Sequence, residues 1–140
     1  MSQPWIIDTG FLVALLNRSE RYHPWAKEHI KQAPYPLLTC EPVITETCFL
    51  LRKIPNGEKT VLELLESQVI QIGLQIYPEI NPIKTLMQRY QSVPMSLADA
   101  CLVRMSERYP NSPLLTLDSD FQVYRKNKDE IIPTIMPNFP

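Results

Sequence analysis

Short apolar runs alternate along this chain with longer stretches of helical pattern, and this alternation limits the possible folds more than any other feature. The runs that predict strands are continuously apolar or alternate with a period of two. They cover residues 5–8, 37–40, 69–76, 113–117 and 131–135. Helical patterns lie between them, at 10–16, 23–33, 42–53, 58–67, 83–91, 96–108 and, briefly, 121–125. Strands that alternate with helices favour right-handed crossovers and a parallel sheet covered on both faces. We therefore expect an α/β fold, a three-layer sandwich whose central parallel sheet has about five strands.

The length and composition fit a single domain over residues 1–140. The chain is 44% hydrophobic and 21% charged, a globular balance, and a net charge of −1 excludes attachment to nucleic acid or membrane by bulk charge alone. No apolar run approaches the ~20 residues of a membrane span, and the N-terminus lacks a signal-peptide pattern. The three cysteines are an odd number without a C-x-x-C pair, which indicates free thiols. We expect a cytoplasmic protein with no membrane contact.

Two acidic residues stand where buried strands are expected to end. Asp8 closes the run at 5–8, and Asp118 follows the run at 113–117 directly. In open parallel sheets, functional sites form at the carboxyl ends of the strands. The sequence therefore predicts that Asp8 and Asp118 lie near each other, at one edge of the sheet.

Two further acids, Glu46 and Asp99, interrupt apolar stretches of predicted helices. Val43 and Phe49 each lie three residues from Glu46, and Leu102 lies three residues after Asp99. Lone carboxylates are rare in such surroundings, because desolvating an unpaired charge is costly. Basic residues are scarce nearby, so a divalent cation that prefers oxygen ligands, Mg²⁺ or Mn²⁺, is the simplest partner.

Helix capping is another explanation for the acids that follow the strands. Asp8 can cap the helix that begins near Gly10, because aspartate is a preferred N-cap residue. Asp118, or Asp120 beside it, can cap the short helix expected at 121–125. Capping and metal binding are compatible, since one carboxylate can accept a backbone N–H and still offer an oxygen to a cation.

The two acids within helices differ in this respect. Ser96 and Asp99 fit a capping box, in which each side chain bonds the backbone N–H of the other residue. Glu46 lies in the middle of its helix and caps nothing. If all four acids were purely structural, each would need a separate structural reason. All four would also have to lie by coincidence at the places where a parallel α/β fold concentrates functional residues.

Four segments, in this order, resemble the PIN-domain ribonucleases, and most of all the small VapC-type toxins of toxin–antitoxin pairs. The segments are Ile6 to Leu16, Thr45-Glu46 before an apolar run, Leu97 to Leu102, and Leu115 to Phe121. The resemblance runs along nearly the whole chain. It implies a central parallel sheet with strand order 3-2-1-4-5 and a metal-dependent phosphodiesterase that cleaves RNA.

The resemblance also implies roles for individual residues. The family's four acids fall on Asp8, Glu46, Asp99 and Asp118, as catalytic residues and ligands of Mg²⁺, for which Mn²⁺ can substitute. Thr9 and Thr116 match positions where the family often uses a hydroxyl to steady the acids, and Asp120 is a second candidate for the fourth acid. The implied partners are an RNA substrate, an antitoxin protein and a second copy of the chain.

Two other functions remain open from the sequence. One is a non-catalytic PIN-like module that binds RNA or protein. Four acids that repel one another argue against it, because an inactive site gains nothing from this repulsion. The other is an unrelated Mg²⁺-dependent phosphohydrolase of the haloacid-dehalogenase type, which needs an Asp where this chain has Gly10. For RNA binding, the candidate phosphate contacts are Arg52, Lys53, Arg104, Arg108, Arg125, Lys126 and Lys128.

Overall fold

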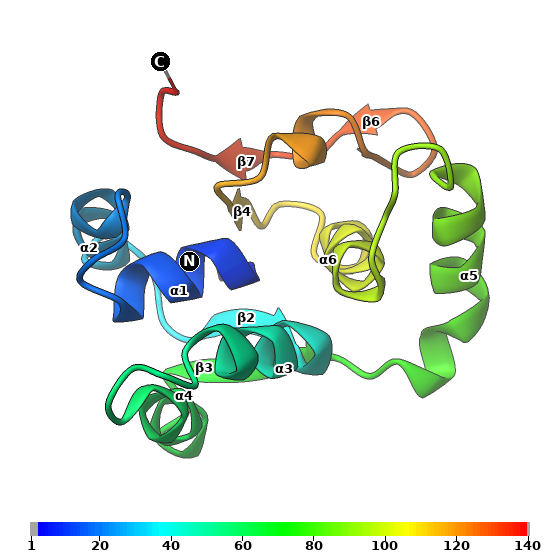
Figure 1. The fold of residues 1–140 in the computed structure, drawn as a ribbon. Coiled ribbons are helices and arrows are strands. Elements are labelled where there is room, and N and C mark those ends of the chain that lie inside the picture. The colour runs from blue at the N-terminus through cyan, green and yellow to red at the C-terminus, as the bar shows by residue number, and fades with distance from the viewer. Residues whose placement is uncertain (1–2, 140) are drawn as a thin grey trace.

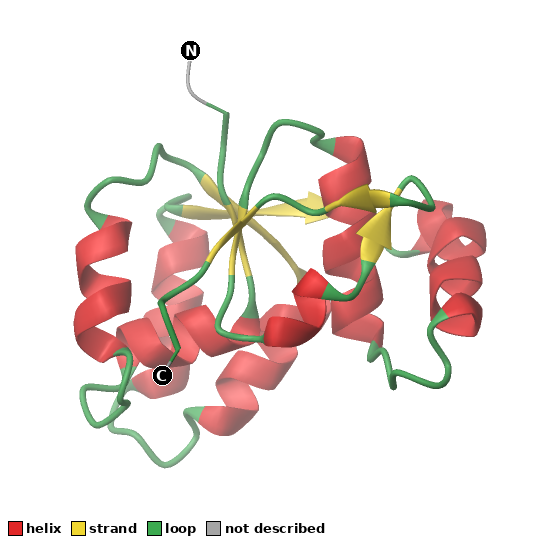
Figure 2. Ribbon diagram, turned by 90° about the horizontal axis from the view of Figure 1, so that it is seen from above, coloured by secondary structure: helices red, strands yellow, loops and turns green. Residues whose placement is uncertain are grey.

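A five-stranded parallel sheet forms the centre of the molecule. The structure is a computed structural model that describes residues 3–139. The sheet consists of β1 (Ile6–Ile7), β2 (Leu37–Cys40), β3 (Ile70–Leu74), β4 (Leu114–Leu115) and β7 (Thr134–Ile135). Its order is β3-β2-β1-β4-β7, and every neighbouring pair is parallel. Figure 2 shows the twisted sheet at the centre of the molecule with helices around it. The expected order 3-2-1-4-5 is confirmed, with β7 as the fifth strand of the sheet.

Six α-helices and two short 3-10 helices connect the described strands. They are α1 (Thr9–Leu16), α2 (His23–Ile30), α3 (Glu41–Leu50), α4 (Gly57–Glu66), η1 (Tyr77–Glu79), α5 (Ile80–Arg89), α6 (Leu97–Arg108) and η2 (Ser119–Gln122). The chain moves outward from β1 to β3 through α1–α4 and returns to β4 through α5 and α6. Right-handed crossovers in opposite directions place these two groups on opposite faces of the sheet. Helix α6 packs on β1, β2 and β3, and α5 lies outside it (Figure 1).

The core explains why β1 and α6 are so apolar. Ile6 and Ile7 of β1 are both fully buried, because the central strand is covered on both faces. Seven of the twelve residues of α6 are buried, since this helix lies between the sheet and α5. The three cysteines are free, and no helix within residues 3–139 is long and apolar enough to cross a membrane.

A buried carboxylate joins the segment before α5 to α6. Glu79 is 6% exposed and accepts a hydrogen bond from Arg104 Nε at 2.7 Å, and Arg108 also pairs with it. These arginines, Arg104 above all, hold the pKa of Glu79 below its usual value. The ion pairs fix η1 against α6 and so set the position of α5.

Several predicted elements are longer than the observed ones. The helix expected at 42–53 ends at Leu50, and the strand expected at 69–76 covers only Ile70–Leu74. After α3 the chain turns sharply through Asn56, whose φ is 60°. A Cβ on Gly57 would lie 2.5 Å from the Leu51 carbonyl oxygen, so this turn requires glycine where α4 begins.

The C-terminal quarter departs most from the predicted pattern. The helix expected at 121–125 is wrong, because η2 begins at Ser119 and Arg125–Lys126 forms β5, which pairs antiparallel with β6 (Glu130–Ile131). Asn127 and Lys128 adopt positive φ in the turn between them. The single strand expected at 131–135 is two strands in different sheets, because β6 pairs with β5 whereas β7 pairs with β4.

Candidate active site

A pocket of about 410 Å³ opens at the carboxyl ends of the central strands, and all four expected acids line it. Asp8 follows β1, Glu46 lies on α3, Asp99 lies in the first turn of α6, and Asp118 follows β4. Four distant parts of the chain therefore meet at this pocket (Figure 1). The polar residues of the lining are Asp8, Thr9, Glu46, Asp99, Asp118 and Ser119.

Asp8 is the most buried of the four acids, with 5% of its surface exposed. It is the N-cap of α1, and its Oδ1 accepts a hydrogen bond from the Phe11 backbone N–H at 2.9 Å. The Thr116 hydroxyl donates to its Oδ2. The capping role expected for Asp8 is therefore confirmed, and the same carboxylate lines the pocket.

The position of Asp8 makes its negative charge costly. Burial above all, together with the negative charges of Asp118 and Asp99, raises the pKa of Asp8 to about 7. The hydrogen bonds from Thr116 and from the Phe11 N–H act in the opposite direction, because they stabilise the ionised form. Asp8 thus carries a charge that the surrounding protein stabilises only in part.

Thr116 links Asp8 to the turn that carries the fourth acid. Its Oγ1 accepts a hydrogen bond from the Asp118 backbone N–H at 2.9 Å while its own proton goes to Asp8. The Asp118 Oδ1 in turn accepts the Asp120 N–H at 2.9 Å, so Asp118 caps η2. Of the two alternatives for this cap, Asp118 is the one observed; Asp120 lies within η2 and does not line the pocket.

Asp99 occupies the N-terminus of α6 through the predicted capping box. The Asp99 N–H donates to Ser96 Oγ at 3.0 Å, and the Ser96 N–H donates to Asp99 Oδ2 at 3.2 Å. The Tyr124 hydroxyl lies 3.3 Å from the same oxygen. Burial is the main cause that raises the pKa of Asp99, and the negative charge of Asp118 adds to it.

Glu46 differs from the other three because its side chain is exposed to solvent, at the rim of the pocket. The apolar residues that border Glu46 in the sequence do not bury it, since the neighbouring Phe49 is itself 60% exposed. Partial desolvation and the negative charge of Asp99 nevertheless raise the pKa of Glu46. This glutamate therefore belongs electrostatically to the cluster although it lies on its solvent side.

Comparison with known proteins identifies the family. The sequence model of the PIN domain matches residues 5–127, which include every residue of the pocket. The chain belongs to the PIN-domain family. It is similar to ribonuclease VapC26 of Mycobacterium tuberculosis, with 29% identity over 115 residues that cover 81% of this chain and 85% of that protein.

The solved structure of a bacterial toxin has the same fold. The crystal structure of VapC20 of Mycobacterium tuberculosis, a toxin that cleaves the sarcin-ricin loop, superposes with a TM-score of 0.77. The match covers 91% of this chain and 98% of VapC20, with 22% sequence identity. At this identity the likeness establishes the arrangement of strands and helices, which agrees with the sheet order described above.

The donor groups of this PIN-domain pocket suit a hard divalent cation. Within residues 3–139, no Lys, Arg or His forms an ion pair with any of the four acids. In the same range, no three His, Cys, Asp or Glu side chains are already arranged to hold an ion. Mg²⁺ does not require such a cage, because it keeps several waters and takes one or two carboxylates directly. An oxygen-lined pocket with unpaired negative charge fits that mode of binding.

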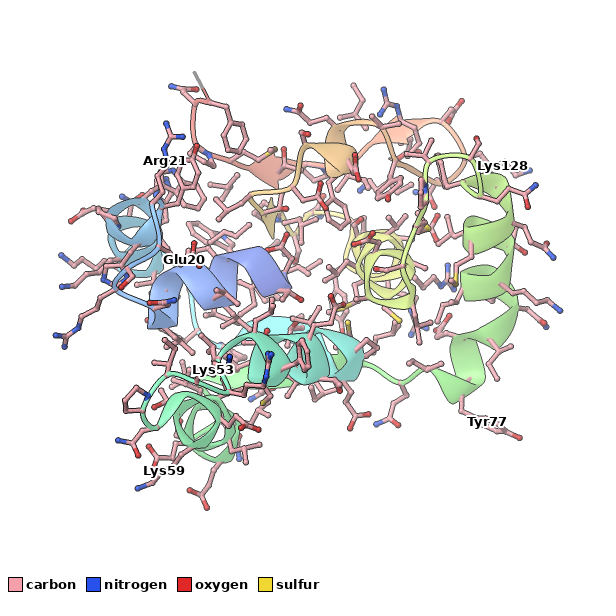
Figure 3. The ribbon with its side chains drawn as sticks, viewed as in Figure 1. Glu20, Arg21, Lys53, Lys59, Tyr77 and Lys128 are labelled. Atoms are coloured by element: carbon pink, nitrogen blue, oxygen red, sulfur yellow. The ribbon has the colours of Figure 1, made fainter. Side chains whose placement is uncertain are left out.

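Several candidate phosphate contacts have structural roles in this PIN domain. Arg104 is paired with Glu79, Lys126 is buried and donates to the Pro110 carbonyl at 2.9 Å, and Arg125 donates to the Gln122 carbonyl at 2.6 Å. Arg108 is paired with Glu79 as well, and Arg52 stacks on the Phe49 ring. The exposed lysines Lys53 and Lys128 remain, and they project from separate parts of the surface (Figure 3).

Two polar residues near the acids were not singled out from the sequence. Ser119 lines the pocket and stands between two aspartates, a position that could have drawn attention to its hydroxyl. Tyr124 is fully buried, and its hydroxyl approaches Asp99. No local pattern indicates this contact, because the two residues are 25 positions apart in the chain.

Proposed function

We propose that this PIN-domain protein is a divalent-metal-dependent endoribonuclease and the toxin of a toxin–antitoxin pair. The observation that carries the proposal is the convergence of Asp8, Glu46, Asp99 and Asp118 on one pocket, where no basic side chain of the described residues pairs with them. Four carboxylates in one pocket repel one another and destabilise the fold. A bound divalent cation would offset this repulsion, and carboxylate oxygens are suitable ligands for it. The similarity to a VapC ribonuclease supports RNA as the substrate.

In this proposal the four acids hold Mg²⁺, and the side chains around them keep the acids in place. A bound Mg²⁺, for which Mn²⁺ can substitute, supplies a water of lowered pKa and neutralises charge that develops on the scissile phosphate. Asp8 is held at both oxygens by the Phe11 N–H and the Thr116 hydroxyl, so its carboxylate cannot swing away. Thr116 keeps Asp118 in register with Asp8, and Glu46 completes the set on the solvent side.

Cleavage assays with the purified protein test this function. Structured RNAs incubated with Mg²⁺ or Mn²⁺ should be cut at internal positions, and EDTA should abolish the cutting. Asp8→Asn and Asp99→Asn should each reduce the rate by orders of magnitude while circular dichroism still shows a folded protein. Asp129→Asn is the matched control, because Asp129 is exposed in the β5–β6 turn, outside the pocket.

The result that would contradict the proposal is equally direct. Undiminished cleavage in EDTA, or in both pocket variants, would show that the activity arises elsewhere or from a contaminant. RNA binding without cleavage under every metal condition would instead favour a non-catalytic binding module.

The proposed partners are an antitoxin protein that blocks the pocket and a second copy of this chain. VapC-type toxins pair with antitoxins, and this chain is similar to such toxins. Co-purification from the native cell, followed by mass spectrometry, tests for a small protein bound to this one. If that partner is an antitoxin, adding it should suppress RNA cleavage.

A further inference from the structure

The hydroxyl of Tyr124 reaches one of the four acids from inside the protein. Tyr124 is the largest of the fully buried side chains, with no exposed surface. Its hydroxyl oxygen lies 3.3 Å from Asp99 Oδ2, 3.4 Å from the Pro94 carbonyl and 3.5 Å from the Val93 carbonyl. All three neighbours are acceptors, and the hydroxyl has a single proton to donate to one of them.

The ring of Tyr124 has little freedom to move away from this position. It packs edge-on against Phe121 with 5.4 Å between the ring centroids, and against Tyr90 at 5.1 Å. Its backbone N–H donates to the Asp120 carbonyl at 3.0 Å. Tyr124 therefore belongs to the turn that carries Asp118, while its hydroxyl contacts Asp99 on α6.

The charge of the acceptors determines which of them receives the hydrogen bond from the Tyr124 hydroxyl. A tyrosine phenol keeps its proton at physiological pH, so the Tyr124 hydroxyl has one hydrogen bond to donate. Of its three acceptors only the Asp99 carboxylate carries a charge, and hydrogen bonds to charged acceptors are the stronger ones. The proton therefore goes preferentially to Asp99 Oδ2.

The second donor to Asp99 reaches the same oxygen. The Ser96 N–H also bonds Oδ2, and no hydrogen bond within residues 3–139 involves Oδ1. We propose that Tyr124 is a positioning residue, which holds Asp99 by Oδ2 so that Oδ1 is left for a divalent cation. This inference rests on the proposed metal-dependent function, and it assigns a role in metal affinity to Tyr124, which forms an aromatic cluster with Tyr90 and Phe121.

Direct measurement of Mn²⁺ binding, without RNA, tests the role of the hydroxyl. Tyr124→Phe removes one oxygen and keeps the ring that packs against Phe121 and Tyr90. Groups that orient metal ligands typically contribute 10–100-fold to affinity, and for a 3.3 Å contact we expect a loss of about tenfold. Calorimetry, or electron paramagnetic resonance of free Mn²⁺, gives the dissociation constant of each protein.

Tyr90→Phe is the matched control from the same cluster. The Tyr90 hydroxyl accepts the Arg125 N–H at 2.9 Å, and it bonds to no acid among residues 3–139. This variant should therefore bind Mn²⁺ as tightly as wild type, and thermal melts in EDTA should show that both variants are folded. In RNA cleavage, Tyr124→Phe should need more Mn²⁺ for half-maximal rate, with little change in KM for RNA.

The outcomes separate this inference from the function on which it rests. If wild type and Tyr124→Phe bind Mn²⁺ equally, the positioning role is refuted and the metal-dependent function stands. Equal losses in Tyr124→Phe and Tyr90→Phe would also refute it, because disturbed packing would then be the cause. A wild-type protein that binds no Mn²⁺ at all overturns the metal site itself, and this inference with it.

Discussion

At the scale of single residues, Asp8 combines two roles that favour different charge states. As the N-cap of α1 it accepts an N–H, which favours the ionised carboxylate, whereas burial beside Asp99 and Asp118 favours the protonated form. The second effect is larger, so the pKa of Asp8 rises from 3.8 to about 7. Without a cation, the fold bears the cost of this charge at neutral pH.

We expect the metal-free protein to lose stability as pH rises from about 4 to about 7. In this window the folded state holds a proton on Asp8 that the unfolded chain has already released, so raising the pH favours unfolding. The pKa values of Asp99 and Glu46 are also raised, so these acids act in the same direction. In EDTA the melting midpoint should be several degrees higher at pH 5 than at pH 8.

Asp8→Asn should weaken that pH dependence, because it removes the charge and keeps an oxygen that can accept the Phe11 N–H. At pH 8 in EDTA the variant should be more stable than wild type, by about 1 kcal/mol or a few degrees. Mg²⁺ should raise the wild-type midpoint more than that of the variant, since a ligand of the native state stabilises it by mass action. A variant that is clearly less stable than wild type at pH 8 would mean that the cap matters more than the repulsion.

At the scale of elements, the turn at η2 shows how one residue can shape both the backbone and the pocket. Asp118 caps η2 through Oδ1 and lines the pocket, whereas Asp120 lies inside the turn. The sequence allowed either residue to be the cap and left both as candidates for the fourth acid. The observed hydrogen bond explains why only Asp118 combines the two roles.

Substitutions at these two aspartates separate the cap from the charge. Asp118→Ala should lose both, with a large fall in RNA cleavage and ~1 kcal/mol of stability from the missing cap. Asp118→Asn keeps an acceptor for the Asp120 N–H, so it should retain the turn and still lose cleavage. Asp120→Ala is the control and should change neither quantity much. Equal kinetic losses at both positions would indicate that both carboxylates approach the metal.

At the scale of the whole molecule, an apolar groove leads from α5 to the acids. It is lined by Ile76, Ile80, Ile83, Met87 and Leu97 among others, and a second hollow continues it past Ile76 and Leu97 to Glu46. Ile80 is 45% exposed and Leu97 is 42% exposed, so large apolar side chains face solvent beside the pocket. Exposed apolar surface of this kind favours association with another protein surface.

We expect the protein to be a homodimer that buries this groove. Light scattering at micromolar concentration should give twice the 16.2 kDa of one chain. Ile80→Asp should shift the mass to that of a monomer, because a buried, unpaired charge in an apolar interface is costly. Leu62→Asp is the matched control, since Leu62 is 58% exposed on α4, outside the groove, and should leave the mass unchanged. A monomeric wild-type mass would contradict the dimer.

The sequence pattern alone was enough to predict the order of strands and helices from β1 to β4, the parallel sheet, and the positions of the four acids along it. These features follow from periodic burial and from capping, which act over a few neighbouring residues and are therefore visible in the chain. The Ser96–Asp99 capping box is an example, because its partners are three residues apart.

The way the acids are held, and the choice of basic residues that are left free, depend on contacts formed only in the folded chain. The Thr116 hydroxyl bonds a carboxylate 108 positions away, and Tyr124 meets Asp99 across 25 positions. Arg104 is neutralised by Glu79, again 25 positions away, and so is withdrawn from the candidate phosphate contacts. Such bonds form between elements that packing brings together, and their geometry depends on distances that no local pattern of hydrophobicity encodes.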